Sequence, residues 1–535
     1  MRQERDALGD WSIDEDAFYG IATARLVSAV NVPGPAFPPE LPGNLLRIRQ
    51  AQAVAFGRSR QWPDRTAAAL AQAAARLAAV PERLAEQIRV TPLHGGGARS
   101  LVLNLDEVLA NAALLEIGAN KGDYHLMAPL FQLDRGLQPL SVYMTSFHIT
   151  MLAELSQLLT AAKTLSARLE QLTLDFSGQE TVAQLQYQDV ELSTLGSDFS
   201  RCGDSIGRSR LRLEQVRAAL IPCWQGTPEV LPVLRELTGL ELAVRRSPDD
   251  FPRNTDLYVE LSSQLKNMAL ALLQFCSRLR VLAGQQRELG LPRLRANPAF
   301  SPAQHEFVAL DTASQLGFAI CGADAATTAA IQCGLENAGA YAPLFTTEIF
   351  RAGRCLSAII RLLSEQVLPE LTGTPEAGRT KAAATPLQAE RLIPLLGYER
   401  AVQVARIAAL TEKPVRLVVE KMKLLSADQL AQCFEVCESK ADRSADDTEK
   451  IFSGEYFCGV SKIWGKLASA RWCKINVAFY AGLTERWYHE QCIRCRAAFR
   501  RRTHASDLCP GGRNGVFRAV LPVSGGAAPS TQPAL

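Results

Sequence analysis

The sequence is poor in aromatic residues and almost balanced in charge. Phe, Trp and Tyr make up 7% of its 535 residues, and the formal net charge is only +3. A surface that binds nucleic acid needs a strong positive field or aromatic side chains on which bases can stack. These two shortages argue against nucleic acid as a partner.

The sequence also has no apolar segment of the kind that enters a membrane. It begins with MRQERDALGD, which is charged and lacks the apolar core of a signal peptide. The least charged stretch, residues 309–335, is interrupted by Asp311 and Asp324. Thirteen cysteines in a long chain without an export signal indicate reduced thiols. We therefore expect a cytoplasmic protein without membrane contact.

The most regular pattern in the chain is an apolar seam between residues 256 and 282. Its members recur at steps of three and four, the spacing of one helical face: Leu257, Leu261, Leu265, Met268, Leu272, Phe275, Leu279 and Leu282. A second stripe of Leu270, Leu273 and Val281 makes the helix apolar on more than one side. Such a helix, roughly 40 Å long, should lie in the middle of a helix bundle and needs partners.

Helical periodicity also covers much of the remaining chain. Further helices are expected over residues 41–61, 64–84, 100–117, 141–172, 194–220, 304–336 and 338–368. Asp64 should cap one of them and Pro343 should kink another. Residues 175–189 are expected to be irregular, and residues 372–385 to form a polar linker.

These patterns predict an all-α protein organised around a long central bundle. The expected divisions are an N-terminal domain (1–140), the bundle (141–371), a small helical domain (386–433) and a divergent tail (434–535).

Several ordered segments resemble one family. They are LGDWSIDEDAFYGIATAR at 8–25, NLDEVLAN and EIGANKGDYH within 104–125, QYQDVELSTLGSDF at 186–199, DDFPRNTDLYV at 249–259 and LIPLLGYERA at 392–401. Together they are similar to the aspartase/fumarase superfamily, and within it to the aspartate ammonia-lyases. The resemblance covers roughly residues 1–433.

The resemblance implies an activity and an assembly. The expected reaction converts L-aspartate to fumarate and ammonia, by removing a proton next to a carboxylate and stabilising the doubly charged intermediate with donors and a cation. It implies a small dicarboxylate or amino-acid substrate, no cofactor and no metal. It also implies a homotetramer in which four segments from different subunits meet to form the site.

The first two of these segments depart from the family pattern. In the first, which normally reads Gly-Thr-Ser-x-Asn, only Ser100 matches; Arg99 replaces the Thr and Val102 replaces the Asn. Arg99 either binds an anion other than the family's substrate or is a solvated loop residue. In the second, the carboxylate-binding Thr-Asn pair has become Pro139-Leu140, and proline also removes a backbone N–H.

The third segment is better preserved than the fourth. Gln186, Gln188 and Asp189 match the third, so Gln186 and Gln188 join Ser100 as candidate substrate-binding residues, although Gln188 and Asp189 would also suit a role in holding a loop. In the fourth, residues 295–302 lack the expected glycines and lysine. Ser301 is its only serine and thus a weak candidate base, unless it caps a helix beginning at residue 304.

Three hypotheses follow for the function. The chain is an aspartase-like ammonia-lyase whose activity is weak or lost, a non-catalytic pseudoenzyme that partners an active relative, or a decayed product without a role.

The tail contains residues at spacings that are typical of zinc sites: His489, Cys492, Cys495, His504 and Cys509. A divergent or out-of-frame tail explains the same composition. The basic run at 494–502 would suit contact with nucleic acid or an acidic surface, but a solvated charge run is expected.

Overall fold

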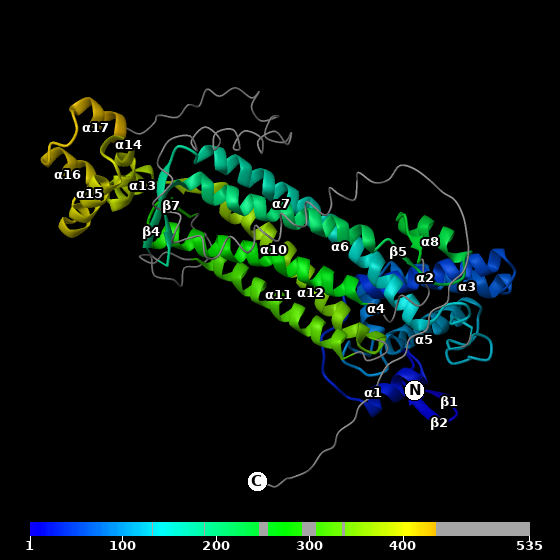
Figure 1. The fold of residues 1–535 in the computed structure, drawn as a ribbon. Coiled ribbons are helices and arrows are strands. Elements are labelled where there is room, and N and C mark those ends of the chain that lie inside the picture. The colour runs from blue at the N-terminus through cyan, green and yellow to red at the C-terminus, as the bar shows by residue number, and fades with distance from the viewer. Residues whose placement is uncertain (131, 187, 246–254, 292–306, 334–337, 435–535) are drawn as a thin grey trace, which may run out of the picture. The chain divides into compact units, whose positions relative to one another are not determined.

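The computed structural model describes residues 1–130, 132–186, 188–245, 255–291, 307–333 and 338–434. Within these ranges the protein is built almost entirely of helices, which confirms the predicted all-α class (Figure 1). Its few strands are short and form two-stranded pairs. None of the described helices combines the length and the apolar character needed to cross a membrane.

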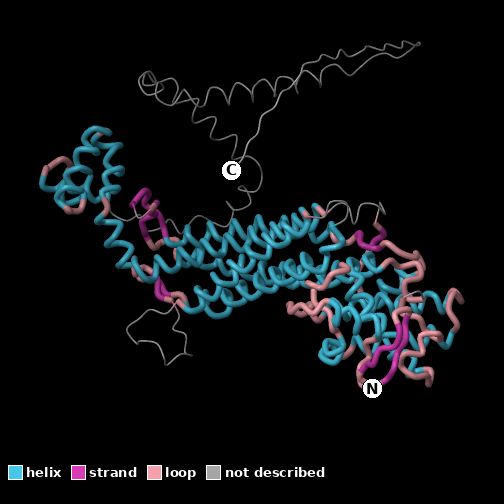
Figure 2. Tube along the Cα trace, turned by 90° about the horizontal axis from the view of Figure 1, so that it is seen from below, coloured by secondary structure: helices cyan, strands magenta, loops and turns pink. Residues whose placement is uncertain are grey.

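Long helices run side by side through the described part of the chain (Figures 1 and 2). They are α6 (Pro139–Asp175), α7 (Leu195–Ala219), α10 (Asp256–Arg280), α11 (Val308–Gln332) and α12 (Ala342–Leu362). Helix α10 contacts α7, α11 and α12, and α6 contacts α7 and α12. The expected bundle is therefore present, with α10 packed against three neighbours.

The seam predicted on α10 is buried. Leu261, Leu265, Met268 and Leu279 are all fully enclosed, and the helix passes into a π-helical turn at Val281–Gln285. The predicted second stripe behaves differently, because Leu270 is 40% exposed and Leu273 is only partly buried in the single chain. One chain thus buries one side of α10 fully and leaves part of another side on the surface.

A buried histidine links three helices at one end of the bundle. The His148 Nδ1–H of α6 donates to Leu220 O after α7 (2.7 Å), and Nε2 accepts from the Tyr258 hydroxyl of α10 (2.9 Å). Phe147 packs edge-on against Tyr258 and Phe350, so aromatic rings surround the imidazole. Burial lowers the pKa of His148 to about 3, although the bond to Leu220 O opposes the shift.

The N-terminal part folds around helix α5 (Ala98–Glu116). It comprises the hairpin β1 (Arg2–Asp6) and β2 (Gly9–Ile13) and helices α1 (Ile21–Ala29), α2 (Glu40–Arg58), α3 (Asp64–Ala78) and α4 (Pro81–Gln87). The break predicted between α2 and α3 is confirmed. Asp64 was expected to cap α3, but it is the first helical residue and makes no side-chain cap bond.

Two adjacent carboxylates on α5 hold this part together. Asp106 accepts two bonds from the fully buried Arg49 of α2 (2.8 and 2.6 Å), and Arg49 also reaches Asp134 (3.0 Å). Glu107 accepts backbone N–H bonds from Gly20, Ala22 and Thr23 at the start of α1 (2.9–3.1 Å). A carboxylate at a helix N-terminus is favourable because it satisfies free N–H groups and faces the positive end of the dipole.

A hairpin follows α6 where irregular chain was expected. Strands β3 (Glu180–Leu185) and β4 (Gln188–Thr194) pair antiparallel with an irregularity at Ala183 and Gln184. The prediction failed because these short strands bury only Thr181 and Val182 fully and carry no sustained apolar alternation. The remaining strand pairs are β5 (Pro222–Trp224) with β6 (Ala243–Val244), before and after α8 (Val230–Thr238), and β7 (Leu289–Gly290) with β8 (Thr372–Gly373).

Two further expectations about local structure were wrong. Residues 372–385 are not a linker, because helix α13 (Pro375–Ala384) occupies most of them. Pro343 does not kink a helix, because it lies in the first turn of α12, where its missing N–H has no partner to lose.

Among the described residues the apolar core has two large clusters, besides a small one of Ile13, Ala17 and Ile21. One continuous cluster extends from Phe37 to Leu368 and joins the N-terminal helices to the bundle. A second cluster lies within residues 389–430, in α14 (Ile393–Leu396), α15 (Tyr398–Thr411), α16 (Val415–Lys421), α17 (Ala427–Phe434) and the preceding 3₁₀ turns. The predicted domain boundaries stay a prediction, and the tail after residue 434 lies outside the described residues.

Lowering the pH from 7 to 4 is expected to reduce the unfolding free energy through His148. The unfolded imidazole takes up a proton near pH 6.5, whereas the buried ring stays neutral until about pH 3. Each pH unit between these values removes up to about 1.4 kcal/mol. Urea denaturation of the wild type and His148→Gln at several pH values measures the effect. The stability difference between the two proteins should shrink as the pH falls; a constant difference would contradict this account.

Candidate functional site

A hollow of about 630 Å³ opens where three helices begin. Its wall is formed by residues 92–99 before and at the start of α5, by Gln138, Pro139 and Leu140 at the start of α6, and by Gly339, Ala340, Tyr341 and Leu344 at the start of α12. The first two of these segments are the ones that the sequence resemblance assigned to substrate binding. The fold therefore brings the first and second segments together in one chain.

Glycine is needed where the loop passes into α5. Gly97 precedes the first residue of that helix with φ +61°, a conformation that other residues rarely adopt. A Cβ atom at this position would lie 2.9 Å from Gly339 O, so the loop could not approach the chain before α12. The glycine-rich loop is thus what closes one side of the hollow.

The charge on the described residues that line the hollow is positive only. Arg99 is exposed there, and no Asp or Glu is among the described residues that line it. The N-termini of α5, α6 and α12 converge on the same space, and each carries a partial positive charge. The arrangement favours an anionic ligand.

His94 is a feature that sequence reasoning missed. Its side chain is 94% buried and lines the hollow, and its Nδ1 accepts the backbone N–H of Thr91 (2.9 Å). Its Nε2 is enclosed and has no hydrogen-bond partner among the described residues. Its place directly before Gly95-Gly96-Gly97 was the available signal, because a side chain there is held against a loop that approaches a helix N-terminus.

Ser100 is near the hollow, but its hydroxyl is already used. Ser100 is buried in the first turn of α5 and its Oγ donates to Gly95 O, which holds the glycine-rich loop in place. Val102 lies in the apolar core, and Pro139 is the first residue of α6. Substrate binding by Ser100 stays a prediction, and its hydroxyl would have to leave Gly95 to take part.

Gln186 and Gln188 lie at the tip of the hairpin β3–β4. Both are exposed, and Gln186 has a left-handed backbone with φ +48°, as expected in a tight turn. Asp189 accepts a bond from Gln184 Nε2 (2.9 Å), which ties it to the neighbouring strand. The loop-holding role expected for Asp189 is therefore visible, whereas ligand binding by Gln186 and Gln188 stays a prediction.

The two groups of candidate residues are far apart in one chain. Helix α6 begins in the hollow at Pro139 and ends at Asp175, and the hairpin follows its end (Figure 1). A helix of 37 residues is roughly 55 Å long. Ser100 therefore cannot meet Gln186 within a single copy.

Two candidate sites fall outside the described residues. Ser301, the weak candidate base, lies in 292–306, and the possible zinc ligands lie after residue 434. Within the described ranges, no group of three or more His, Cys, Asp and Glu side chains is arranged to hold a metal ion.

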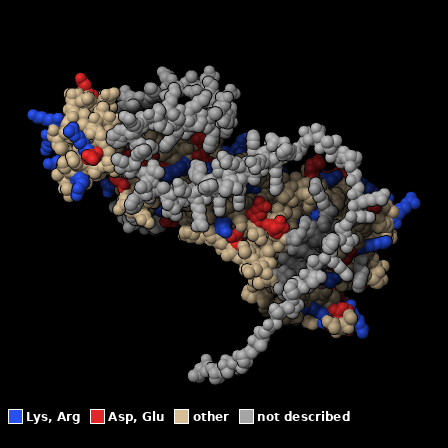
Figure 3. Space-filling model, in the orientation of Figure 1, with Lys and Arg blue, Asp and Glu red and all other residues tan. Residues whose placement is uncertain are grey.

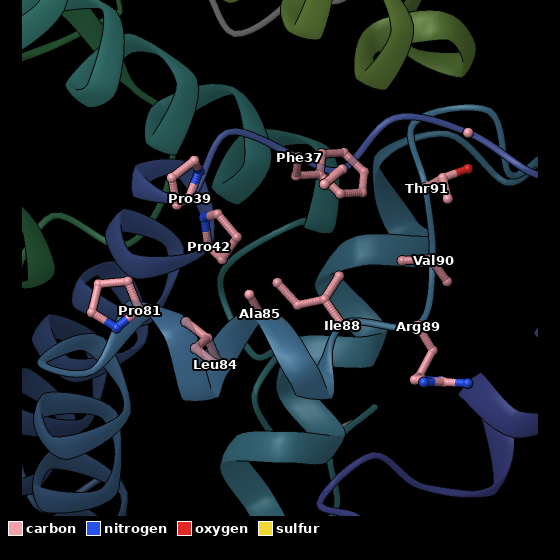
Figure 4. A pocket seen from close by; sticks show the side chains of 12 residues that line it. Phe37, Pro39, Pro42, Pro81, Leu84, Ala85, Ile88, Arg89, Val90 and Thr91 are labelled. Atoms are coloured by element: carbon pink, nitrogen blue, oxygen red, sulfur yellow. The ribbon is translucent and has the colours of Figure 1, made fainter.

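A second cavity, of about 200 Å³, lies between α4 and the chain before α2. Phe37, Leu84 and Ile88 surround it together with three prolines (Figure 4). The guanidinium of Arg89 stacks over the Tyr19 ring (5.6 Å), and the figure shows it pointing away from the apolar side chains. Arg89 is the charged residue among those that line this cavity, and its guanidinium lies over Tyr19, so the cavity offers mainly packing surface.

Comparison with known proteins identifies similar sequences. No family model matches the chain. It is 26% identical to an aspartate ammonia-lyase of Corynebacterium glutamicum over 450 residues, which covers 80% of this chain and 85% of the relative. It is 25% identical to the aspartate ammonia-lyase of Escherichia coli K12 over 480 residues, with coverage of 84% and 99%.

Solved structures agree with the sequence comparisons. A fumarate lyase:delta crystallin from Brucella melitensis is 27% identical with a TM-score of 0.75, covering 81% of this chain and 99% of the other. A class II fumarase from Schistosoma mansoni is 16% identical with a TM-score of 0.73 over 81% and 99%, which shows a shared fold.

Replacing Gly97 by Ala is expected to destabilise the protein by roughly 1–3 kcal/mol, because the new Cβ is strained at positive φ and meets Gly339 O. Gly95→Ala is the matched control in the same loop, since a Cβ there meets nothing within 4 Å. Urea denaturation compares the two variants. Equal stability of both would show that the contact with Gly339 is not needed.

Proposed function

Because the chain belongs to the aspartase/fumarase superfamily, we propose that it is an aspartase-like member in which conversion of L-aspartate to fumarate and ammonia is weak or absent. The aspartate ammonia-lyases among its relatives support the reaction class. The changed residues in the hollow support the loss of turnover. A cytoplasmic location and the absence of cofactors and nucleic-acid partners belong to the same proposal.

One observation carries the proposal: the hollow offers no side-chain hydroxyl from serine or threonine. Its described wall contains Arg99, Pro139 and Leu140 where the family pattern has Thr, Thr and Asn. Pro139 starts a helix without an N–H, and the nearby Ser100 hydroxyl bonds to Gly95 O. The Thr and Asn donors of the family pattern are therefore missing from the described wall, where Gln138 and Tyr341 are the neutral side chains that can still donate.

The size of the expected loss follows from the chemistry. Proton removal next to a carboxylate places a second negative charge on that group, and its stabilisation depends on donors that are already oriented. Removing one such donor typically slows turnover by a factor of ~10²–10³. Several losses do not multiply simply, because the groups act as a unit. Weak or undetectable turnover is the consequence.

We also propose that the chain forms the homotetramer that the resemblance implies. The candidate residues lie beyond opposite ends of α6, so a complete site would need segments from different copies. On the bundle, Leu270, Leu273 and Phe318 surround a shallow hollow between α10 and α11, and Phe318 is 65% exposed. Large apolar side chains on an otherwise mixed surface suit a contact with another copy.

A second candidate function is that of a non-catalytic subunit or binding partner of an active relative. Two observations together favour it. The α10 seam is buried and the nearby Phe318 is exposed, so the surfaces for packing and assembly are present, whereas the wall of the hollow is altered. A scaffold that can still assemble would keep a role without turnover.

Formation of fumarate from L-aspartate, argininosuccinate or malate, followed by its ultraviolet absorbance, tests the proposal. We expect a rate at least ~10²-fold below that of an active aspartate ammonia-lyase measured in parallel. If activity remains, Gln186→Ala should abolish it, while the exposed Gln215→Ala on α7 should not. A rate equal to that of the active enzyme would contradict the proposal. Silence together with co-purification of an active relative would favour the partner role.

Phe318→Glu is expected to shift the assembly toward smaller species, because each contact with a partner would bury a charge. Size-exclusion chromatography with light scattering gives the mass. Leu410→Glu is the control: Leu410 is 82% exposed but lies on α15, away from the bundle. An unchanged mass for Phe318→Glu would remove this face from the proposed interface.

A further inference from the structure

His94, which lines the hollow at the start of α5, carries a buried hydrogen-bond donor without an acceptor. The Thr91 backbone N–H points at Nδ1 of His94, and the Thr91 hydroxyl lies 3.0 Å from the same atom. Nδ1 is therefore the accepting nitrogen, and the imidazole proton sits on Nε2. Nε2 has no partner among the described residues, although buried donors are usually paired. A ligand atom that accepts a hydrogen bond would satisfy it.

The surrounding charge narrows the class of ligand. Three helices of 19, 37 and 21 residues begin at the wall of the hollow. Each N-terminus is equivalent to about half an elementary charge, and Arg99 adds a full one, so the field is roughly that of +2.5. No described lining residue carries a compensating carboxylate. A carboxylate group carries one negative charge and would leave much of this field unmatched, whereas a phosphoryl group carries up to two charges on a single group.

We propose that this hollow binds a doubly charged oxyanion of the phosphoryl class, with the His94 Nε2–H and the Arg99 guanidinium as its donors. The inference rests on the proposed function to the extent that the hollow is a ligand site of this protein. It adds that the replacement of neutral donors by Arg99 has changed the preferred ligand. Guanidinium groups bind phosphoryl oxygens through paired N–H bonds, and a glycine-rich loop at a helix N-terminus lets the ligand approach closely.

Isothermal titration calorimetry of the full chain with inorganic phosphate tests the proposal, with succinate at equal ionic strength as the carboxylate probe. Phosphate should bind at least about tenfold more tightly than succinate. Arg99→Gln and His94→Phe should each weaken phosphate binding by roughly tenfold or more, since each removes a bond to a charged group. Arg83→Gln, which removes an exposed arginine of α4 that does not line the hollow, should leave binding unchanged.

His94→Gln separates folding from binding, because its amide can still donate. It should retain more phosphate affinity than His94→Phe, while circular dichroism checks that both variants are folded. Equal or tighter binding of succinate would overturn the choice of ligand. Loss of binding in Arg83→Gln to the same extent as in Arg99→Gln, or no phosphate binding at all, would overturn the site.

The fumarate assay run on the same samples distinguishes the two proposals. Phosphate binding with full aspartase turnover would leave this site standing and remove the proposed loss of activity. Weak or absent turnover together with phosphate binding insensitive to Arg99→Gln and His94→Phe would remove this site and leave the proposed function intact.

Discussion

Burial of the α10 seam is the constraint on which the other features depend. Each fully enclosed leucine of the seam contributes roughly 1.5–3 kcal/mol relative to an exposed one, and α7, α11 and α12 supply the surfaces that enclose it. Once α10 is held among these neighbours, α6 packs along α7 and α12. The packed helices then fix the positions of their own ends, where ligands would bind. Substitutions at those ends leave the packing of the bundle helices intact.

The helices were predictable because burial imposes a period of three to four residues on the sequence. The same reasoning failed where burial is slight: the polar strands of the β3–β4 hairpin and the small helix α13 have little apolar pattern to read. Pro343 shows a different limit, since a proline suits the first turn of a helix as well as a kink, and only the position of the helix start decides between them.

The residues that line the candidate site were predictable from the sequence, but their hydrogen-bonding roles were not. The altered residues Arg99, Pro139 and Leu140 do lie together, as their segments suggested. Two details depend on loop geometry, which sequence periodicity does not reveal. Ser100 donates to Gly95 O, and His94 carries its proton on Nε2. The surface on the visible face mixes acidic and basic side chains, so the positive character of the hollow is a local property (Figure 3).

The position of Glu107 has a consequence for the order of events on the ribosome. Its carboxylate is the acceptor for the first N–H groups of α1, and it is encoded 84 residues after Thr23. At roughly 5–20 residues per second, translation takes about 4–17 s to cover that interval. Until then α1 lacks the acceptor of its first N–H groups, so it docks after α5 has been made. Helix α1 is thus among the later parts of the N-terminal region to reach its native place.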